Sequence, residues 1–200
     1  MKILIVGGTG TVGQAVAKEL KPRHGVILAG SKSGDIQVDV TSLDSIRQMY
    51  QSVKNLDAIV FTAGKVHFGP LTEMTAEQFN VGLQNKLMGQ INLVLEGQKH
   101  LNPNGSFTLT SGVLNYDPIL LASSAAAVNG AIDGFVKSAA LELPHHLRIN
   151  TVSPTVLTES LDTYAPYFRG FKSVAAQEVA LAYAKSIEGA QTGQVYKVGF

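Results

Sequence analysis

The sequence predicts an α/β protein built on a doubly wound parallel sheet. A short apolar run, Ile3 to Val6, ends in a glycine-rich turn and precedes a helical pattern, which is typical of a central parallel strand and the helix that follows it. Strand and helix patterns then alternate along the chain, which favours right-handed crossovers with helices on both faces of one sheet. The length of 200 residues, 45% of them hydrophobic, suits one domain over residues 1–200.

The first half of the chain contains four predicted strands and two predicted helices. Ile36, Val38 and Val40 alternate with polar residues as a short third strand, and Thr41 with Asp44 resembles a capping pair at the start of the second helix. The other elements of this half are strands over residues 3–6, 25–29 and 58–61, a helix over 14–20, and helical spacing from 46 to 53.

The second half contains two long predicted helices. Thr75 and Gln78 form a capping box at the start of the first, which extends to about residue 98, and the second covers residues 121–143. Pro103 to Gly105 read as a turn before the fifth strand. The remaining elements are strands over 106–110, 148–152 and 194–198 and a helix over 174–187, which brings the predicted strands to seven.

The turn after the first strand carries Gly7, Gly10 and Gly13 in a GxxGxxG spacing. Glycine lets the backbone approach a phosphate closely, and the free N–H groups and positive dipole end of the next helix attract an anion. Ligands of doubly wound sheets lie beyond the carboxyl ends of the strands, so the turn predicts a dinucleotide site. The alternative to a dinucleotide site is a tight turn that only joins two packed elements. A P-loop is excluded, because no GK[ST] follows the glycines.

The end of the second strand favours NADP(H) over NAD(H) as the cofactor. NAD sites usually place an acidic residue there, whereas NADP sites avoid that charge and often supply a cation for the 2′-phosphate. This chain has Ser31 and Lys32 at that point, and Asp35 lies too far along the sequence, beyond the SKSG turn, to occupy the acidic position. A solvated loop lysine is the alternative for Lys32. Asp39, after the third strand, is either an acceptor for the adenine amine or a helix-start carboxylate.

Composition excludes several classes of function. Sixteen basic and fifteen acidic residues leave a net charge of +1 without a basic block, so nucleic acid is not an expected partner. The chain has no cysteine, and His145 with His146 lacks a third ligand at metal spacing, so we expect no metal site. No signal peptide or membrane-spanning run is recognisable, which leads us to expect a soluble, cytoplasmic protein that does not bind membranes.

The chain resembles the short-chain dehydrogenase/reductase superfamily over essentially its whole length. The motifs that carry the resemblance are GGTGTVG after the first strand, DVT at 39–41, AG at 63–64, KLMGQINLV from 86, TSG at 110–112, GFVKSAALEL from 134, RINTVSP from 148 and TGQVYKVG near the end. The resemblance implies a seven-stranded Rossmann sheet, hydride transfer between a nicotinamide and a small-molecule carbonyl or alcohol, and homo-oligomers paired through the two long helices.

The resemblance also implies a set of cofactor-binding residues. Pro154 stands where the family has Pro-Gly, and Thr158 sits one position before the residue that bonds the carboxamide. The full set expected to bind the cofactor is Gly7, Thr9, Gly10, Thr11, Val12, Ser31, Lys32, Asp39, Val40, Ala63, Gly64, Pro154 and Thr158.

The catalytic residues that the resemblance implies are only partly present. Ser111 matches the serine that positions the substrate oxygen, but the tyrosine and lysine of the YxxxK motif fall on Ala125 and Asn129, and the helix asparagine falls on Lys86. Ala125 cannot donate a proton, and Asn129 carries no charge that would lower the pKa of a phenol from about 10. The family's usual mechanism therefore cannot operate unchanged.

A relocated pair is one hypothesis for the missing chemistry. Lys86 approaches from the neighbouring helix, and Tyr116 lies on the loop after Ser111, so the two are candidates for the pKa-lowering cation and the acid. A solvated helix lysine and a half-buried loop aromatic are the alternatives. Two functions follow: an NADPH-dependent reductase with an altered catalytic set, or a cofactor-binding sensor or regulatory partner that has lost turnover.

The segment from Glu159 to Lys172 corresponds to the family's substrate loop. It contains four aromatic residues, Tyr164, Tyr167, Phe168 and Phe171. These favour either a lid over an apolar substrate or a small helix packed on the core.

Overall fold

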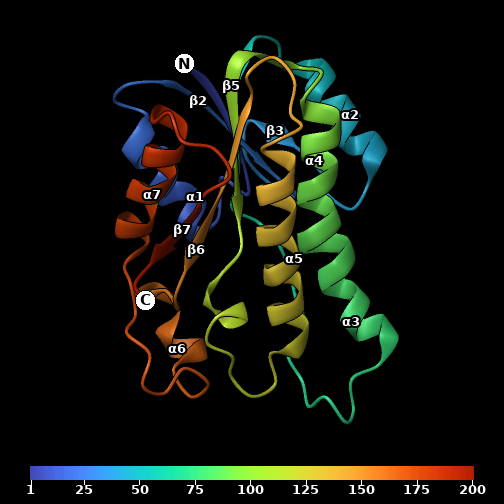
Figure 1. Cartoon of the computed structure of the whole chain (residues 1–200), viewed down its shortest axis with the longest axis vertical. Coiled ribbons are helices and arrows are strands. Elements are labelled where there is room, and N and C mark those ends of the chain that lie inside the picture. The colour runs from blue at the N-terminus through green and yellow to red at the C-terminus, as the bar shows by residue number, and fades with distance from the viewer.

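The structure is a computed structural model that describes residues 1–200 (Figure 1). Seven parallel strands form one sheet in the order β3-β2-β1-β4-β5-β6-β7. The chain moves outward from β1 to β3 and then returns to place β4 on the other side of β1, so the order of the strands reverses between β1 and β4. This confirms the predicted doubly wound sheet. The strands are β1 Lys2–Val6, β2 Gly25–Gly30, β3 Ile36–Gln37, β4 Leu56–Phe61, β5 Leu101–Thr110, β6 Arg148–Pro154 and β7 Val195–Val198.

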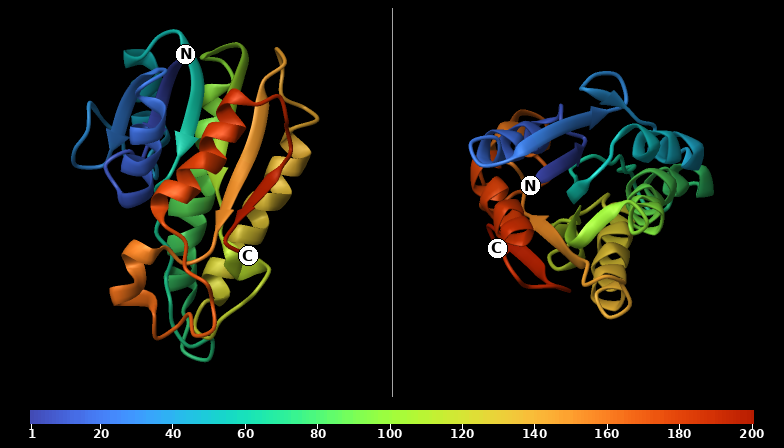
Figure 2. Two further views of the ribbon diagram at one scale, coloured as in Figure 1. Left: turned by 90° about the vertical axis from the view of Figure 1, so that its left-hand side faces the viewer. Right: turned by 90° about the horizontal axis from the view of Figure 1, so that it is seen from above.

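Helices cover both faces of the sheet (Figures 1 and 2). One face carries α1 and α7, which pack against each other, and the opposite face carries α2, α4 and α5. None of these helices is both long enough and apolar enough to cross a membrane. The helices are α1 Thr11–Leu20, α2 Leu43–Ser52, α3 Ala76–Gly82, α4 Gly89–Gly97, α5 Ser123–Ala139, α6 Leu161–Tyr164 and α7 Ala176–Glu188.

The apolar run of β1 is explained by its position at the centre of the sheet. Successive side chains of a strand point to opposite faces. Accordingly, Ile3 and Ile5 belong to the core cluster under α1 and α7, whereas Leu4 and Val6 belong to the cluster under α2, α4 and α5. Because both faces are covered, no polar residue is required in the run.

The third strand and the start of the second helix differ from the prediction. β3 contains only Ile36–Gln37, and Val38 and Val40 follow it as buried residues outside the strand. The predicted capping pair of Thr41 and Asp44 is wrong, because Ser42 is the N-cap and its hydroxyl accepts the N–H of Ser45. Thr41 instead donates to the carboxylate of Asp39.

The predicted long helix from Thr75 is interrupted by a π-helical segment. The capping box of Thr75 and Gln78 is confirmed, with both of its hydrogen bonds present. Between α3 and α4, however, Leu83–Met88 forms a π-helix. Such insertions are rare and occur frequently at functional sites, and this one contains Asn85 and Lys86.

Two further boundaries differ from the prediction. α5 is shorter than the predicted 121–143 because Leu121 has a positive φ of 68° and the chain leaves the helix after Ala139. β5 already begins at Leu101, so the predicted turn at 103–105 lies within its first half, where the pairing with β4 is irregular.

Candidate functional site

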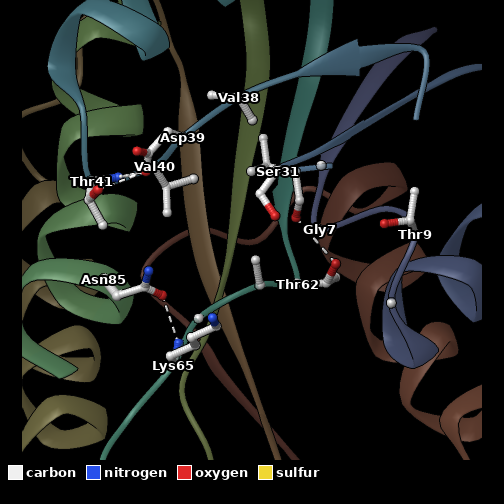
Figure 3. Close-up of a pocket in the computed structure, with 15 residues that line it drawn as sticks. Gly7, Thr9, Ser31, Val38, Asp39, Val40, Thr41, Thr62, Lys65 and Asn85 are labelled. Carbon is white, nitrogen blue, oxygen red and sulfur yellow. Dashed lines mark hydrogen bonds between the residues drawn. The ribbon is translucent and has the colours of Figure 1, made fainter. Parts of the chain in front are cut away.

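A cavity of about 460 Å³ lies beyond the carboxyl ends of β1, β2 and β4 (Figure 3). This is the edge of the sheet at which the strand order reverses. It brings together eight of the predicted cofactor-binding residues: Gly7, Thr9, Gly10, Ser31, Asp39, Val40, Ala63 and Gly64.

Two glycines of the turn at this cavity, Gly7 and Gly13, have no room for a side chain. Gly7 has a φ of +84°, and a Cβ on it would lie 2.5 Å from the backbone nitrogen of Ala63. A Cβ on Gly13 would lie 2.2 Å from the carbonyl oxygen of Gly7. The turn is thus packed closely against both β4 and the first turn of α1, as a phosphate-binding turn requires.

The start of α1 offers free hydrogen-bond donors at the turn. Gly10 is the N-cap, and no side chain caps the helix. The N–H groups of Thr11 and Val12 lie in the first helical turn and have no backbone acceptor. These donors and the helix dipole fit the diphosphate of a dinucleotide. Thr11 and Val12 themselves do not line the cavity.

At the end of β2 a serine lines the cavity, and no carboxylate does. Ser31 lines the cavity, whereas Lys32 is exposed beside it and lines neither this cavity nor its neighbours. The carboxylate of Asp35 accepts the N–H of Leu28 at 2.8 Å, which holds it away from the cavity. The nucleotide cavity therefore has no acidic residue at the end of β2.

Asp39 lines the cavity and also takes part in the turn before α2. Its Oδ1 accepts hydrogen bonds from the hydroxyl and the N–H of Thr41, at 2.7 and 2.9 Å. These two bonds, led by the hydroxyl, lower the pKa of Asp39 below its ordinary value. The carboxylate is therefore ionised at neutral pH and remains an acceptor at the edge of the cavity.

Sequence reasoning missed four polar residues of this cavity: Thr41, Thr62, Lys65 and Asn85. Thr62 is the first residue after β4, so its place at a strand end was an available signal. The side-chain oxygen of Asn85 accepts the backbone N–H of Lys65 at 2.7 Å, as Figure 3 shows. Asn85 carries no such signal, because it belongs to the π-helical segment and a regular helix was expected there.

A second cavity, of about 190 Å³, lies beyond the ends of β5 and β6. The two cavities are neighbours, because Gly64 of the first packs against Lys86 of the second, and a Cβ on Gly64 would lie 2.8 Å from the Cγ of Lys86. The second cavity is lined by the predicted residues Lys86, Ser111 and Pro154 together with Ala125 and Asn129, on which the sequence resemblance places the tyrosine and lysine of YxxxK.

Lys86 is held by two oxygen acceptors at the edge of this cavity. Its ammonium donates hydrogen bonds to the carbonyl oxygen of Ser111 at 2.9 Å and to Oδ1 of Asn129 at 2.7 Å. Burial of the amine lowers its pKa to about 8, and the negative charge of Asp133 acts in the opposite direction. Lys86 therefore titrates close to neutral pH.

The hydroxyl of Ser111 has no hydrogen-bond partner in the chain. Ser111 is 3% exposed, and its Oγ is buried at the second cavity. The hydroxyl of Thr155, which the sequence reasoning missed, is likewise buried without a partner in the lining. Buried hydroxyls are normally satisfied, so these two are available to a bound molecule.

Tyr116 does not lie with Lys86 and Ser111. Its hydroxyl donates to Oδ2 of Asp133 at 2.7 Å, and the ammonium of Lys197 lies 3.7 Å from the centre of its ring. Partial burial and the bond to Asp133 raise its pKa to about 12. Tyr116 lines neither cavity, so the structure does not bring the predicted pair together.

Thr158 also lies outside both cavities. Its hydroxyl donates to the hydroxyl of Ser173 at 3.1 Å, and it begins a short helical turn.

The aromatic segment packs on the core, as the second alternative predicts, and part of it also lines cavities. It contains the short helix α6, and Phe168 and Phe171 pack at the core cluster of Val113 and Leu114. Phe168 also lines the second cavity and an adjoining apolar cavity of about 190 Å³. That adjoining cavity is lined by Phe68, Val156, Leu157, Ser160, Tyr164 and Phe168.

The comparisons with known sequences give one family and several distant relatives. A family model described as enoyl-(acyl carrier protein) reductase matches residues 10–193. Versicolorin reductase 1 of Dothistroma septosporum is 29% identical over 164 residues, which cover 79% of this chain and 62% of that protein. L-xylulose reductase of Mesocricetus auratus is 29% identical over 128 residues, 62% of this chain and 52% of that protein. The chain thus spans less than two thirds of the length of these relatives.

Solved structures match over nearly the whole chain. The protein lin1944 from Listeria innocua is 53% identical, with a TM-score of 0.97 and coverage of 98% of both chains. A small-chain dehydrogenase in complex with NADPH is 27% identical, with a TM-score of 0.89 and coverage of 99% of this chain and 96% of that one. The chain therefore belongs to the short-chain dehydrogenase/reductase superfamily, a family of oxidoreductases that bind a nicotinamide cofactor.

Proposed function

We propose that the protein is an NADP(H)-dependent oxidoreductase that interconverts a small-molecule carbonyl compound and an alcohol, with Lys86 as its proton donor. The observation that carries this proposal is the second cavity. There the ammonium of Lys86 and the unpartnered hydroxyl of Ser111 lie together, next to the cavity that fits a dinucleotide.

The side chains of this cavity suit the stabilisation of a substrate oxygen. A bound nicotinamide supplies or accepts the hydride at the substrate carbon. Ser111 has a hydroxyl free to donate a hydrogen bond to the substrate oxygen. Lys86 has three N–H donors, of which the acceptors on Ser111 and Asn129 take two. The third donates to the same oxygen and delivers a proton to it when the carbonyl is reduced.

The pKa of Lys86 supports this role. An acid is most effective when its pKa lies near the working pH, and burial brings the pKa of Lys86 to about 8. Tyr116 is the weaker candidate, because its hydroxyl already donates to Asp133 and its pKa is raised to about 12. We therefore place the proton transfer on Lys86 and give Tyr116 no contact with the substrate.

The preference for NADP(H) is supported by the end of β2. Ser31 lines the nucleotide cavity, the exposed Lys32 follows it, and Asp35 is engaged by Leu28. A 2′-phosphate would thus meet a hydroxyl and a mobile cation rather than a carboxylate. The small-chain dehydrogenase that is 27% identical was solved in complex with NADPH, which agrees with this preference.

Pairing into homo-oligomers through the long helices is part of the proposal. Apolar side chains are exposed on α3, on α4 and just beyond the end of α5, at Val81, Leu95 and Leu141. A second copy of the chain would cover such residues if the helices paired.

The replacement of the family's tyrosine by Ala125 favours a second candidate, a cofactor-binding sensor or regulatory partner without turnover. Both candidates bind NADPH, so the test is turnover. We expect the purified protein to oxidise NADPH with a panel of apolar aldehydes and ketones and to lose most of this activity in Ser111→Ala. Saturable NADPH binding without turnover of any compound would favour the sensor.

A further inference from the structure

Asp133 is a buried carboxylate that the proposed reaction leaves without a role. It lies on α5 and is 4% exposed. Its Oδ2 accepts hydrogen bonds from Nδ2 of Asn115 at 2.9 Å and from the hydroxyl of Tyr116 at 2.7 Å, whereas Oδ1 is buried without a partner. No basic side chain forms a salt bridge with it. A buried carboxylate in this state needs a compensating charge nearby.

Lys86 provides the opposite charge on the far side of Asn129. Asn129 and Asp133 are four residues apart on α5, so they lie on the same face of the helix. The ammonium of Lys86 donates to Asn129 at 2.7 Å, which makes Asp133 the next side chain along that face from the bound ammonium. The charge of Asp133 opposes the effect of burial on the pKa of Lys86.

The other elements around Lys86 bring no second buried carboxylate. Glu159, beyond β6, accepts the N–H of Ala176 at 3.0 Å, and Glu96, on α4, pairs with Arg47 at 3.3 Å. The other titratable groups on these elements are Lys65 and His67 after β4, Tyr116 and the exposed Asp117 after β5, Lys137 in α5, Arg148 in β6, Lys197 in β7 and Glu77 in the first turn of α3.

We propose that Asp133 is a positioning residue that keeps the amine of Lys86 protonated at neutral pH, acting across Asn129 without touching the substrate. The inference deepens the proposed function and rests on it, because the protonated amine is the proton donor assigned there. Asn115 and Tyr116 hold the carboxylate of Asp133 in place through the hydrogen bonds that they donate to it.

The test is the titration of Lys86 in the full chain, measured by NMR on protein labelled with carbon-13 at the lysine Cε. Lys86→Met identifies the signal. In Asp133→Asn, which removes the charge, we expect the midpoint of Lys86 to fall by about one pH unit or more, because an opposite charge favours the ammonium. Asn115→Ala is the matched control, since it removes one donor but keeps the carboxylate, and it leaves the midpoint close to that of the wild type. An unchanged midpoint in folded Asp133→Asn, or an equal shift in both variants, would overturn the inference.

A second variant covers the case in which Asp133→Asn does not fold. Asp133→Ser also removes the carboxylate, and we expect the same fall in the midpoint of Lys86. An unchanged midpoint in folded Asp133→Ser contradicts the coupling. The titration of Lys86 requires neither cofactor nor turnover, so a failed coupling is distinguishable from a failed assignment of Lys86 as the proton donor, which is tested by the turnover of Lys86→Met.

Discussion

The ammonium of Lys86 donates a hydrogen bond of 2.7 Å to the side-chain oxygen of Asn129. The family motif that the chain resembles has the reverse arrangement, with asparagine at position 86 and lysine at position 129. We infer that the two residue types have exchanged helices, so that the site keeps one cation and one amide. What it lacks is the tyrosine, whose position is taken by Ala125 in the lining of the same cavity.

Ser111→Ala is expected to lower kcat by about 10- to 100-fold, because a donor to the developing negative charge is lost. Its hydroxyl bonds to no group of the chain, so the melting temperature is expected to stay close to that of the wild type. Steady-state kinetics and thermal unfolding monitored by circular dichroism measure the two effects. Ser153→Ala, another buried hydroxyl without a partner, is the control and retains full activity. Equal losses in both variants would remove Ser111 from the site.

The rate of carbonyl reduction is expected to fall as the pH rises through about 8. The pKa of Lys86 is lowered to about 8 by burial, so above this pH the amine has lost the proton that it must donate. Alcohol oxidation needs the deprotonated amine, and its rate rises over the same range. Profiles of kcat against pH in both directions measure this. Reduction that stays constant up to pH 10 would be inconsistent with Lys86 as the acid.

Tyr116→Phe is expected to keep the wild-type kcat at neutral pH and to lose about 1 kcal/mol of unfolding free energy. The phenol donates one hydrogen bond to Asp133 and lines neither cavity, so its loss affects stability rather than the chemical step. Urea denaturation and steady-state kinetics test the two parts separately. A loss of about 100-fold in kcat with an intact fold would instead support Tyr116 as the proton donor.

Lys32→Ala is expected to weaken NADPH binding by about 10-fold and to leave NADH binding unchanged. We expect the exposed ammonium next to Ser31 to contact the 2′-phosphate, which NADH lacks. Titration of the two cofactors, followed by fluorescence or calorimetry, measures the ratio. Lys21→Ala, at the exposed end of α1, is the matched control for a general loss of positive charge. The same effect on both cofactors would contradict recognition of the phosphate.

The sequence carried enough information to predict the sheet and the nucleotide cavity. Each apolar strand ends at a recognisable break, and eight predicted residues at these breaks line one cavity. Local rules worked because the glycine turn and the strand ends are determined by residues adjacent in the sequence. The capping box at Thr75 succeeded for the same reason, since both of its hydrogen bonds lie within four residues.

The catalytic cavity was predicted less completely because its geometry depends on contacts between distant segments. The position of Tyr116 is determined by Asp133, which is 17 residues away. No pattern in the loop sequence itself predicts this contact. The π-helical segment that contains Asn85 and Lys86 has no sequence signal that separates it from a regular helix. Thr155 was missed because its hydroxyl is distinguished only by the lack of a partner in the folded chain.

The most direct test of the account is kcat for NADPH-dependent carbonyl reduction by Lys86→Met, with NADPH affinity and melting temperature measured on the same sample. Lys99→Met, an exposed lysine just beyond α4 on the surface, is the matched control. We predict that Lys86→Met folds and binds NADPH but loses about 100-fold or more in kcat, the usual contribution of a general acid, whereas Lys99→Met is unaffected. Wild-type kcat in folded Lys86→Met would contradict the central claim that this lysine replaces the missing tyrosine.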